Sequence, residues 1–371
     1  MTFIHELPNW TGFAWDDRVI SPLLASVRYQ QGKLLGKMEA LGLSLQNEAQ
    51  LETLTLDIVK SNEIEGENLE RQQVRSSVAR RLGLPTAGLP TPSHHIDNVV
   101  AIMLDATREY LKPLTKQRLF GWHASLFPGS YSGLNQIAVG KWRKDTKGPM
   151  QVVSGSMGKE RIHFQAIDAE RLPGEMDKFL TWFNKDPKLD PMLKSGLAHL
   201  WFVTIHPFED GNGRIARAIG DLQLCRADET DKRFYSLSTQ IQKERGDYYK
   251  ILELTQRGNT EITLWLEWYL NCINRSLAAT DKILSAVNNK TAFWKKFSNV
   301  QFNDRQRHML NKLLDGFHGK LTSTKWAKIT KCSHDTALRD IKALLAAEVI
   351  MQDDSGGRST SYSIRQLKLV R

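Results

Sequence analysis

The sequence has few cysteines and no long hydrophobic run, and each absence narrows the class of protein. Its 371 residues include three cysteines, at positions 225, 272 and 332, which are too far apart to form a C-x-x-C pair. That pattern argues against a zinc site and fits a reducing cytoplasm, which is the location that we expect. No apolar run approaches the roughly 18 residues that span a bilayer, and the N-terminus lacks a basic start before an apolar core. We therefore expect neither a membrane segment nor a secretory signal.

The composition is typical of a globular protein, and the net charge is positive. Hydrophobic residues make up 41% of it, charged residues make up 25%, and the formal net charge is +10. Apolar residues recur at helical spacing over most of the length, which predicts an all-α fold. Ser21-Pro22 is a suitable N-cap and first residue for the first long helix. The loop 84–93 marks a boundary, so we expect a helical N-terminal domain over 1–83, a core over 94–284 and a tail over 301–371.

The strongest pattern spans residues 206–217, which are His-Pro-Phe-Glu-Asp-Gly-Asn-Gly-Arg-Ile-Ala-Arg. Apolar, helix-like stretches precede and follow it, so it predicts a helix, a tight loop and the start of a second helix. Gly211 and Gly213 allow positive φ and bring successive N–H groups close to a bound group. Unpaired N–H groups in the first turn of a helix form an anion site. Arg214 and Arg217 project from one face of that helix, and the whole pattern suits a polyphosphate.

His206 and Asp210 add groups that are suited to chemistry on such a ligand. A histidine, with an unperturbed pKa of about 6.5, can take a proton from a hydroxyl near neutral pH. An aspartate offers the hard oxygen that Mg²⁺ prefers beside phosphate oxygens. Each residue alone is more often structural, and their order and spacing together indicate a site.

These residues resemble the signature of the Fic (filamentation induced by cAMP) family, His-Pro-Phe-x-Asp/Glu-Gly-Asn-Gly-Arg-x-x-Arg, and every fixed position is met. The resemblance implies a Fic-type helical core and adenylylation, which is the transfer of AMP from ATP to a hydroxyl of a target protein. It implies that His206 is the general base and that Asp210 is the Mg²⁺ ligand. The nucleotide phosphates would be held by the remaining motif residues, namely Gly211, Asn212, Gly213, Arg214 and Arg217.

A second match to the family lies upstream, at Ser61-Asn62-Glu63-Ile64-Glu65-Gly66. It fits Ser/Thr-x-x-x-Glu-Gly/Asn, the family's inhibitory-helix motif, and it falls at the end of a helix predicted over 44–65. The resemblance implies that Glu65 pairs with Arg217 and holds the enzyme in check, with Ser61 one turn earlier on the same face. An ordinary helix C-terminus with solvated glutamates, stopped at Gly66, is the alternative.

Between residues 140 and 167 the helical spacing of apolar residues gives way to short runs of residues that favour β-strands. Gln151-Val152-Val153 and Arg161-Ile162-His163-Phe164 flank Ser154-Gly155-Ser156-Met157-Gly158, which predicts a β-hairpin. In the family such a hairpin forms a flap that lines the site and pairs with an extended target segment. A surface hairpin without a function is the alternative.

Two adjacent aromatic residues, Tyr248 and Tyr249, follow Arg217 in a predicted helix. The family often has aromatic residues near the nucleotide at this place. Packing in the hydrophobic core is the other interpretation.

The tail predicts three helices and a small hairpin, after a connecting helix or linker over 285–300. The third helix, 335–345, would carry Arg339 and Lys342 outward, and strands at 349–351 and 362–364 would flank Gly356-Gly357-Arg358. This outline is typical of a winged helix-turn-helix and resembles the tails of some bacterial Fic proteins. The tail supplies +6 of the net charge, so we predict DNA binding, with dimerisation or target docking as the alternative. The expected phosphate contacts are Lys325, Lys328, Lys331 and Arg358.

The function that these features favour is a Mg²⁺- and ATP-dependent protein adenylyltransferase, autoinhibited by Glu65, that modifies a Ser, Thr or Tyr hydroxyl of a target protein. One alternative is a DNA-binding regulator that uses the nucleotide site as a sensor. The intact His206 counts against it, because a sensor needs phosphate ligands but no base. A third hypothesis is the reverse reaction, removal of AMP, with Glu65 orienting a water. The loop residues do not exclude UTP or GTP, and the sequence leaves a homodimer open.

Overall fold

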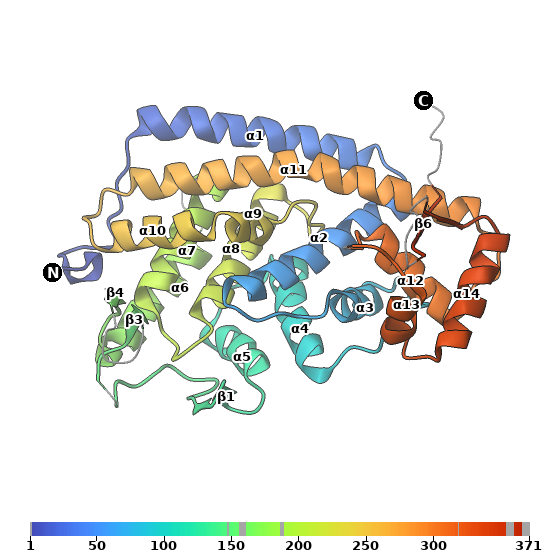
Figure 1. Cartoon of the computed structure of the whole chain (residues 1–371). Helices are drawn as coiled ribbons and strands as arrows, with labels where there is room; N and C mark the ends of the chain where they lie inside the picture. Colours follow the sequence, from blue (N-terminus) through green and yellow to red (C-terminus); the bar gives the residue numbers. More distant parts are fainter. Residues whose placement is uncertain are drawn as a thin grey trace.

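The computed structural model describes residues 2–146, 148–155, 161–185, 189–317, 319–353 and 360–365. This part of the chain contains fourteen α-helices and three two-stranded antiparallel hairpins, which confirms the predicted all-α class. Two long helices, α1 (Asp17–Glu39) and α11 (Thr263–Lys296), lie side by side along one edge of the molecule (Figure 1). The N-terminus lies near the β3–β4 hairpin at one end, and the last three helices form the other end. Within these ranges no helix has the length and apolar character to cross a membrane.

The N-terminal segment folds as a short 3-10 helix and three α-helices, with bounds η1 Ile4–Glu6, α1 Asp17–Glu39, α2 Leu43–Ile64 and α3 Arg71–Arg81. The predicted start of α1 at Ser21-Pro22 is wrong. The cap is Asp16, whose carboxylate accepts a hydrogen bond from the backbone N–H of Arg18 at 2.9 Å, and Pro22 lies inside the helix. A tertiary contact fixes this earlier start, because the Asp16 N–H donates to the hydroxyl of Thr263 at 2.7 Å.

The middle of the chain supplies most of the remaining helices and two of the hairpins. Their bounds are α4 His94–Arg108, α5 Lys116–Leu126, β1 Tyr131–Ser132, β2 Asn135–Gln136, β3 Gln151–Ser154, β4 Arg161–Gln165, η2 Ala169–Arg171, α6 Leu172–Asn184, α7 Pro191–Ile205, α8 Asn212–Asp228, α9 Leu237–Lys243, α10 Arg245–Gln256 and α11 Thr263–Lys296. The hairpin predicted over 140–167 is β3–β4. The β1–β2 hairpin is a small further hairpin that no sequence pattern described above indicated.

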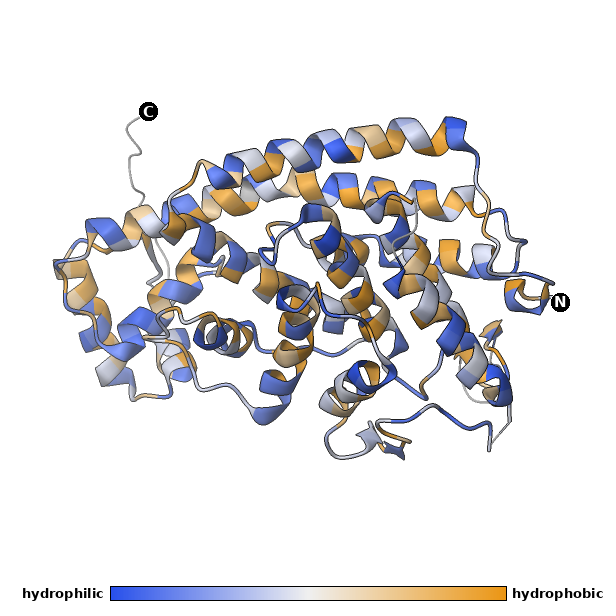
Figure 2. Ribbon diagram, turned by 180° about the vertical axis from the view of Figure 1, so that it is seen from behind, coloured by the Kyte–Doolittle hydropathy of each residue, from blue (hydrophilic) through white to orange (hydrophobic). Residues whose placement is uncertain are grey.

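A single hydrophobic core joins the N-terminal helices to those of the middle segment. It includes Ile58 and Ile64 from α2 and almost the whole of α7, in which every residue from Met192 to Ile205 is buried. A helix enclosed on all sides is apolar all round, which explains why this stretch lacks a polar stripe. Figure 2 shows hydrophobic residues on the faces that the helices turn toward one another. The core thereby fixes where α7 ends and the loop 206–211 begins.

The tail forms a second, smaller core at the far end of α11. Its elements are α12 Asp304–Leu314, α13 Ser323–Thr330, α14 His334–Ala346, β5 Ile350–Gln352 and β6 Tyr362–Ile364. α11 continues through the predicted connecting segment to Lys296, and its Phe293 packs into this second core. Arg339 and Lys342 are exposed on α14, as expected. The predicted turn Gly356-Gly357-Arg358 lies outside the described residues, and DNA binding stays a prediction.

Close packing between α7 and α11 gives a test of this core. A Cβ at Gly196 would lie 2.9 Å from Cδ1 of Tyr269, and that ring is held by a 2.7 Å hydrogen bond between its hydroxyl and that of Ser195. We therefore expect Gly196→Ala to lower the free energy of unfolding by about 1–3 kcal/mol, as overpacking does in other cores. Urea denaturation measures the change. The control is Gly174→Ala in α6, where a Cβ meets nothing within 4 Å; equal stabilities of the two variants would contradict the packing described.

Candidate functional site

The candidate site is built where α7 turns into α8. His206 ends α7 in a left-handed conformation, with φ 53° and ψ 58°, which turns the chain sharply toward the loop. Gly211, with φ 81°, then caps α8, and a Cβ there would lie 3.0 Å from Leu126 and Phe127. The loop therefore packs against the end of α5. The N–H groups that follow it belong to the first turn of α8 and have no partner within the helix.

His206 is positioned to act as a base. Its Nδ1 lies 3.3 Å from the carbonyl oxygen of Val203, and since a carbonyl only accepts, Nδ1 carries the proton and Nε2 keeps a free lone pair. Burial lowers the pKa of His206 to about 4, a shift that the Val203 carbonyl partly opposes and that Arg143 increases. The imidazole is therefore neutral at physiological pH, which is the state that a general base needs.

A cavity of about 790 Å³ lies in front of His206. It is lined by Glu65 from the end of α2, by Gly213 of α8, by the β3–β4 hairpin and by Tyr248 and Tyr249 of α10. The structure thus brings together residues that are up to about 190 positions apart in the sequence, within a volume typical of small-molecule sites.

Arg217 lies behind the loop and is almost completely buried, with 1% of its side chain exposed. Its Nε donates to the hydroxyl of Ser61 at 2.9 Å, and its Nη2 donates to the Ser61 carbonyl and to Oε1 of Glu65, both at 2.8 Å. The contact between Glu65 and Arg217 that the inhibitory motif led us to expect is therefore present. The Glu65 carboxylate also lies against Gly213, so it occupies the start of α8.

Gly66 brings a second carboxylate, Glu67, into the site. With φ 82°, Gly66 ends α2, while the N–H groups of Gly66 and Glu67 bond back to the carbonyls of Glu63 and Asn62, as in a Schellman motif. This turn points Glu67 at the first arginine of the signature, where its Oε2 lies 2.9 Å from Nη1 of Arg214. No sequence pattern indicated Glu67, although it stands two positions after Glu65.

His95, at the start of α4, holds Glu67 in place. Its Nε2 lies 2.5 Å from the other carboxylate oxygen of Glu67. This hydrogen bond lowers the pKa of Glu67, with a further contribution from the charge of Arg214. His95 was also missed, because 28 residues separate it from Glu67 and no local pattern joins them.

Each arginine still has an N–H group for which the described residues offer no hydrogen-bond partner. These are Nε of Arg214 and Nη1 of Arg217, both buried. A buried donor without an acceptor is costly, so the pair favours an anionic ligand at this place. The ring of Phe127, 5.1 Å from the Arg214 guanidinium, holds the first arginine from its other side.

Asn212 has a different role in this structure from the one expected. Its amide donates to the carbonyl of Phe208 at 2.8 Å and accepts from the Phe208 N–H at 3.0 Å. The side chain therefore braces the loop from within. The expected contact of Asn212 with a phosphate stays a prediction.

Asp210 is the acidic group at the mouth of the loop. One carboxylate oxygen accepts from the N–H of Gly211 at 2.5 Å, and the other accepts from the hydroxyl of Ser132. Among the described residues no cluster of three or more His, Cys, Asp and Glu side chains could hold a metal ion. Asp210, with 43% of its side chain exposed, nevertheless fits a Mg²⁺ ion held mainly by phosphate oxygens and waters.

Two further residues that the sequence did not single out support the loop. His123 stacks on Phe208 with ring centroids 4.1 Å apart, and its Nε2 lies 3.2 Å from the carbonyl of Asp210. Arg143 donates to the carbonyl of His206 at 2.8 Å and its N–H to that of Pro207 at 2.9 Å. Both come from α5 and the segment after it, so only the tertiary fold reveals them.

The β3–β4 hairpin lines the cavity as predicted for the flap, although Ser156, Met157 and Gly158 of its turn lie outside the described residues. Val152 pairs with Phe164, and Val153 pairs with Ile162 across a register shift. Val152, Val153 and Ile162 are exposed, and Gln151 is half-buried, whereas Phe164 is buried against Phe3 and anchors the hairpin.

His163 fastens this hairpin to α10. Its Nδ1 lies 2.7 Å from Glu253, and its Nε2 lies 2.6 Å from the hydroxyl of Ser154. Arg161 adds an ion pair to the same glutamate at 2.9 Å. The contacts of His163 and Arg161 with Glu253 thus hold the exposed strand residues beside the cavity.

The two tyrosines of α10 differ in their surroundings. Tyr248 is buried, and its hydroxyl lies 2.9 Å from Nε2 of His199, so it belongs to the core while forming the back of the cavity. Tyr249 is 40% exposed and stacks near the Arg245 guanidinium at 5.5 Å. Of the two, Tyr249 has the ring surface that a ligand can reach.

The fold is helical, and a neutral histidine, a glycine loop and two arginines surround the start of α8. Comparison with known protein families identifies the class that has these features. Residues 113–224 match the model of the Fic/DOC family, and residues 3–84 match one described as a domain of unknown function, DUF4172. Residues 113–224 therefore form a Fic/DOC domain, and the resemblance drawn from residues 206–217 is confirmed.

Named relatives share this domain over a limited length. The chain is 35% identical over 112 residues to a protein adenylyltransferase Fic of Nematostella vectensis, which is 30% of this chain and 24% of that protein. It is 32% identical over 104 residues to the protein of the same name from Drosophila melanogaster, 28% of this chain and 20% of that one. The chain thus matches about a quarter or less of the length of these relatives.

Solved structures extend the likeness in fold. A Fic family protein from Desulfovibrio desulfuricans G20 has a TM-score of 0.51 at 20% identity, covering 94% of this chain and 96% of its own. A Fic domain-containing signaling protein from Bacteroides thetaiotaomicron VPI-5482 has a TM-score of 0.52 at 20% identity, covering 70% and 97%. At this identity the comparison concerns the fold alone.

The pKa of His206 gives a direct test of the site. Because burial lowers it to about 4, the ring should stay neutral from about pH 8 down to about pH 5.5, where an unperturbed histidine with a pKa of about 6.5 would already be charged. A histidine-selective NMR titration measures this, with the signal assigned by its loss in His206→Gln. A midpoint near that of a free histidine would contradict the buried, carbonyl-bonded ring.

Proposed function

We propose that this protein transfers AMP from ATP to a hydroxyl side chain of a target protein, and that its own α2 restrains the reaction. The observation that carries the proposal is the neutral imidazole of His206 in a cavity that Gly213 of the glycine loop also lines. Behind that loop, Arg214 and Arg217 each keep a buried N–H group without a partner among the described residues. The names of the Nematostella and Drosophila relatives support the same reaction class.

In the proposed step, Nε2 of His206 removes the proton from the acceptor hydroxyl. The hydroxyl oxygen then forms a bond to the α-phosphorus of ATP, the bond from that phosphorus to the oxygen bridging to the β-phosphate breaks, and pyrophosphate leaves with the electron pair. Arg214, Arg217 and the N–H groups of the first turn of α8 stabilise the charge on the leaving phosphates. The chain contributes position, charge and a proton acceptor.

Asp210 would hold a Mg²⁺ ion beside those phosphates. When bound, the ion would neutralise charge on the leaving pyrophosphate. Ser132 and the N–H of Gly211 fix the orientation of the carboxylate toward that place.

The flap supplies the place for the acceptor segment. Val153 and Ile162 stand exposed on the strands beside the cavity that His206 lines. An extended segment of the target that added to the edge of the hairpin would bring its hydroxyl to Nε2 of His206.

Replacing His206 should separate chemistry from binding. We expect His206→Ala to lower the rate of AMP transfer by on the order of 10²–10⁴, the usual contribution of a general base. ATP affinity should stay nearly unchanged, because the arginines and the loop amides bind the phosphates. Label transfer from ATP and isothermal calorimetry measure the two quantities, and the surface variant His94→Ala serves as the control. A His206→Ala variant with most of the wild-type rate would remove the base assignment.

Removing the Glu65 carboxylate should raise the rate of AMP transfer. In the structure it occupies the guanidinium of Arg217 and the space against Gly213 that a γ-phosphate would need. A displaced reacting atom costs on the order of 10²-fold per about 1 Å, so Glu65→Gly should raise self-adenylylation by at least about tenfold. Adding Arg217→Ala should cancel the gain. The control is Glu63→Gly, two residues before Glu65 and paired with Lys60, which should leave the rate unchanged. An AMP-sized mass increase on the intact chain is the readout; no gain in Glu65→Gly would favour a chance match of the motif or a role in the reverse, AMP-removing reaction.

Glu67 should add a second, independent restraint. It neutralises Arg214, whereas Glu65 neutralises Arg217. Glu67→Gln removes the charge and keeps the size, so we expect a rise of a few fold alone and a further rise of about the same factor on the Glu65→Gly background, since ion pairs of this kind contribute about 1 kcal/mol. Initial rates at several ATP concentrations show the effect as a lower apparent KM. If the double variant is no faster than Glu65→Gly, Glu67 only fixes the turn after α2.

A further inference from the structure

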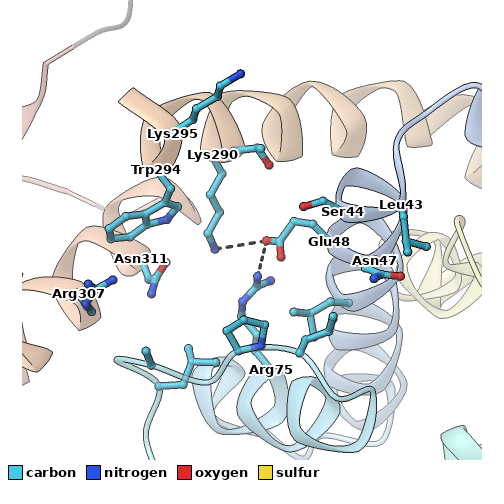
Figure 3. Close-up of a pocket in the computed structure, with 16 residues that line it drawn as sticks. Leu43, Ser44, Asn47, Glu48, Arg75, Lys290, Trp294, Lys295, Arg307 and Asn311 are labelled. Carbon is cyan, nitrogen blue, oxygen red and sulfur yellow. Dashed lines mark hydrogen bonds and ion pairs between the residues drawn. The ribbon is translucent and has the colours of Figure 1, made fainter. Parts of the chain in front are cut away.

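A second cavity lies at the junction of the N-terminal helices with the tail. It has a volume of about 690 Å³, within the range of small-molecule sites. Its walls come from the first turns of α2, from α3, from the loop after α3, from the end of α11 and from α12 (Figure 3). It shares no lining residue with the cavity in front of His206.

The floor of this cavity is a buried charge network. Glu48 lies between Arg75 and Lys290 in the centre of the view in Figure 3. Lys290 also pairs with Asp315, the residue after α12, at 2.7 Å. Glu52 pairs with Arg75 at 3.1 Å and with Arg71, so the network joins three carboxylates to three cations. Burial alone raises the pKa of Asp315, but Lys290 and the two nearby arginines outweigh it and lower that pKa. These paired charges are rigid and leave no excess charge of their own.

One wall carries polar groups that the described residues leave without a partner. Arg307 and Asn311, four residues apart on α12, line the cavity beside Trp294, as Figure 3 shows. Within the described ranges Arg307 forms no ion pair, and the Asn311 side chain forms no hydrogen bond. The Arg307 guanidinium lies 5.9 Å from the Trp294 ring and 5.8 Å from the Phe302 ring. An unneutralised cation, an amide and a flat aromatic ring therefore face the same space.

A second wall of the cavity is apolar. It consists of Leu51 from α2 and Leu84, Pro85 and Leu89 from the loop after α3. Gly88, with φ 76°, lets this loop touch α12, since a Cβ there would lie 2.5 Å from Cβ of Arg307. The contact fixes the loop and the root of the Arg307 side chain together, so the distance between the apolar wall and the cation is set by the fold.

We propose that this cavity is a binding site for a small, flat organic anion, such as an aromatic ring that carries a carboxylate or sulfonate. The acid group pairs with Arg307 and accepts from the Asn311 amide, and the ring lies between Trp294 and the leucine-proline wall. The occupant touches the start of α2, and α2, with 22 residues, is roughly 33 Å long at about 1.5 Å per residue. The site is thus remote from Glu65 at the other end of the same helix, and the proposal holds whichever reaction the Fic/DOC domain performs.

The test uses two fluorescent probes that differ in one charge. They are 1-anilinonaphthalene-8-sulfonate and its uncharged counterpart N-phenyl-1-naphthylamine, titrated into the full-length protein with and without saturating ATP. We expect one saturable sulfonate site that ATP does not displace. Arg307→Gln should raise the Kd of the sulfonate by roughly tenfold, the loss of one charge-assisted contact, and leave the Kd of the uncharged probe within about twofold.

Two further variants make the result decisive. Trp294→Leu should weaken both probes, because the ring surface serves both. Arg339→Gln, which removes an exposed arginine of the same tail on α14, should change neither, and thermal unfolding of each variant verifies that the tail is folded. The proposal is overturned if the sulfonate does not bind, if ATP displaces it, or if Arg307→Gln leaves its Kd unchanged.

Discussion

A buried guanidinium that must meet an anion is the constraint on which the structure around the loop 206–211 depends. Arg217 is 1% exposed, and an isolated charge at that depth would cost several kcal/mol. The anion can be a phosphate of a bound nucleotide or a carboxylate of the chain itself. In the structure the chain supplies it, through Glu65, and supplies another, Glu67, for Arg214. Under the proposed function, nucleotide binding at this loop would therefore be an exchange of anions.

The Glu65 carboxylate has a defined position because it directly follows a firmly packed helix. α2 is buried over most of its length, and polar contacts as well as apolar ones hold it. Asp57, in its middle, accepts hydrogen bonds from the hydroxyl of Ser236 and from the N–H of Ser238 at the start of α9. A helix fixed in this way sets the distance from Glu65 to Arg217 by its own register, which a loose segment could not do.

The local spacing of residues 206–217 was sufficient to predict the loop. The pairing of Glu65 with Arg217 followed from the resemblance to the Fic family, and the structure contains it at 2.8 Å. The groups that the sequence did not reveal act across long separations. His95 reaches Glu67 from a different helix, Arg143 holds the His206 carbonyl from a loop, and Asn212 turns its amide into the loop. The start of α1 was misplaced for the same reason, since Asp16 is fixed by Thr263, far along the chain. Periodicity reports which face of a helix is buried, and it says nothing of the partner that buries it.

Buried ion pairs near both ends of α2 fix the register of this helix. At its C-terminal end it meets the buried Arg217, and near its N-terminal end Glu48 and Glu52 meet Arg75, which has 6% of its side chain exposed. Buried ion pairs add little net stability, but a displaced partner would leave a charge uncompensated, so they penalise any other register. A shift of α2 by one residue would break the pairs at both ends at once. The apolar core holds α2 in place, and the ion pairs near the two ends of α2 fix its register. That register places the Glu65 carboxylate, and not another one of the helix, at Arg217.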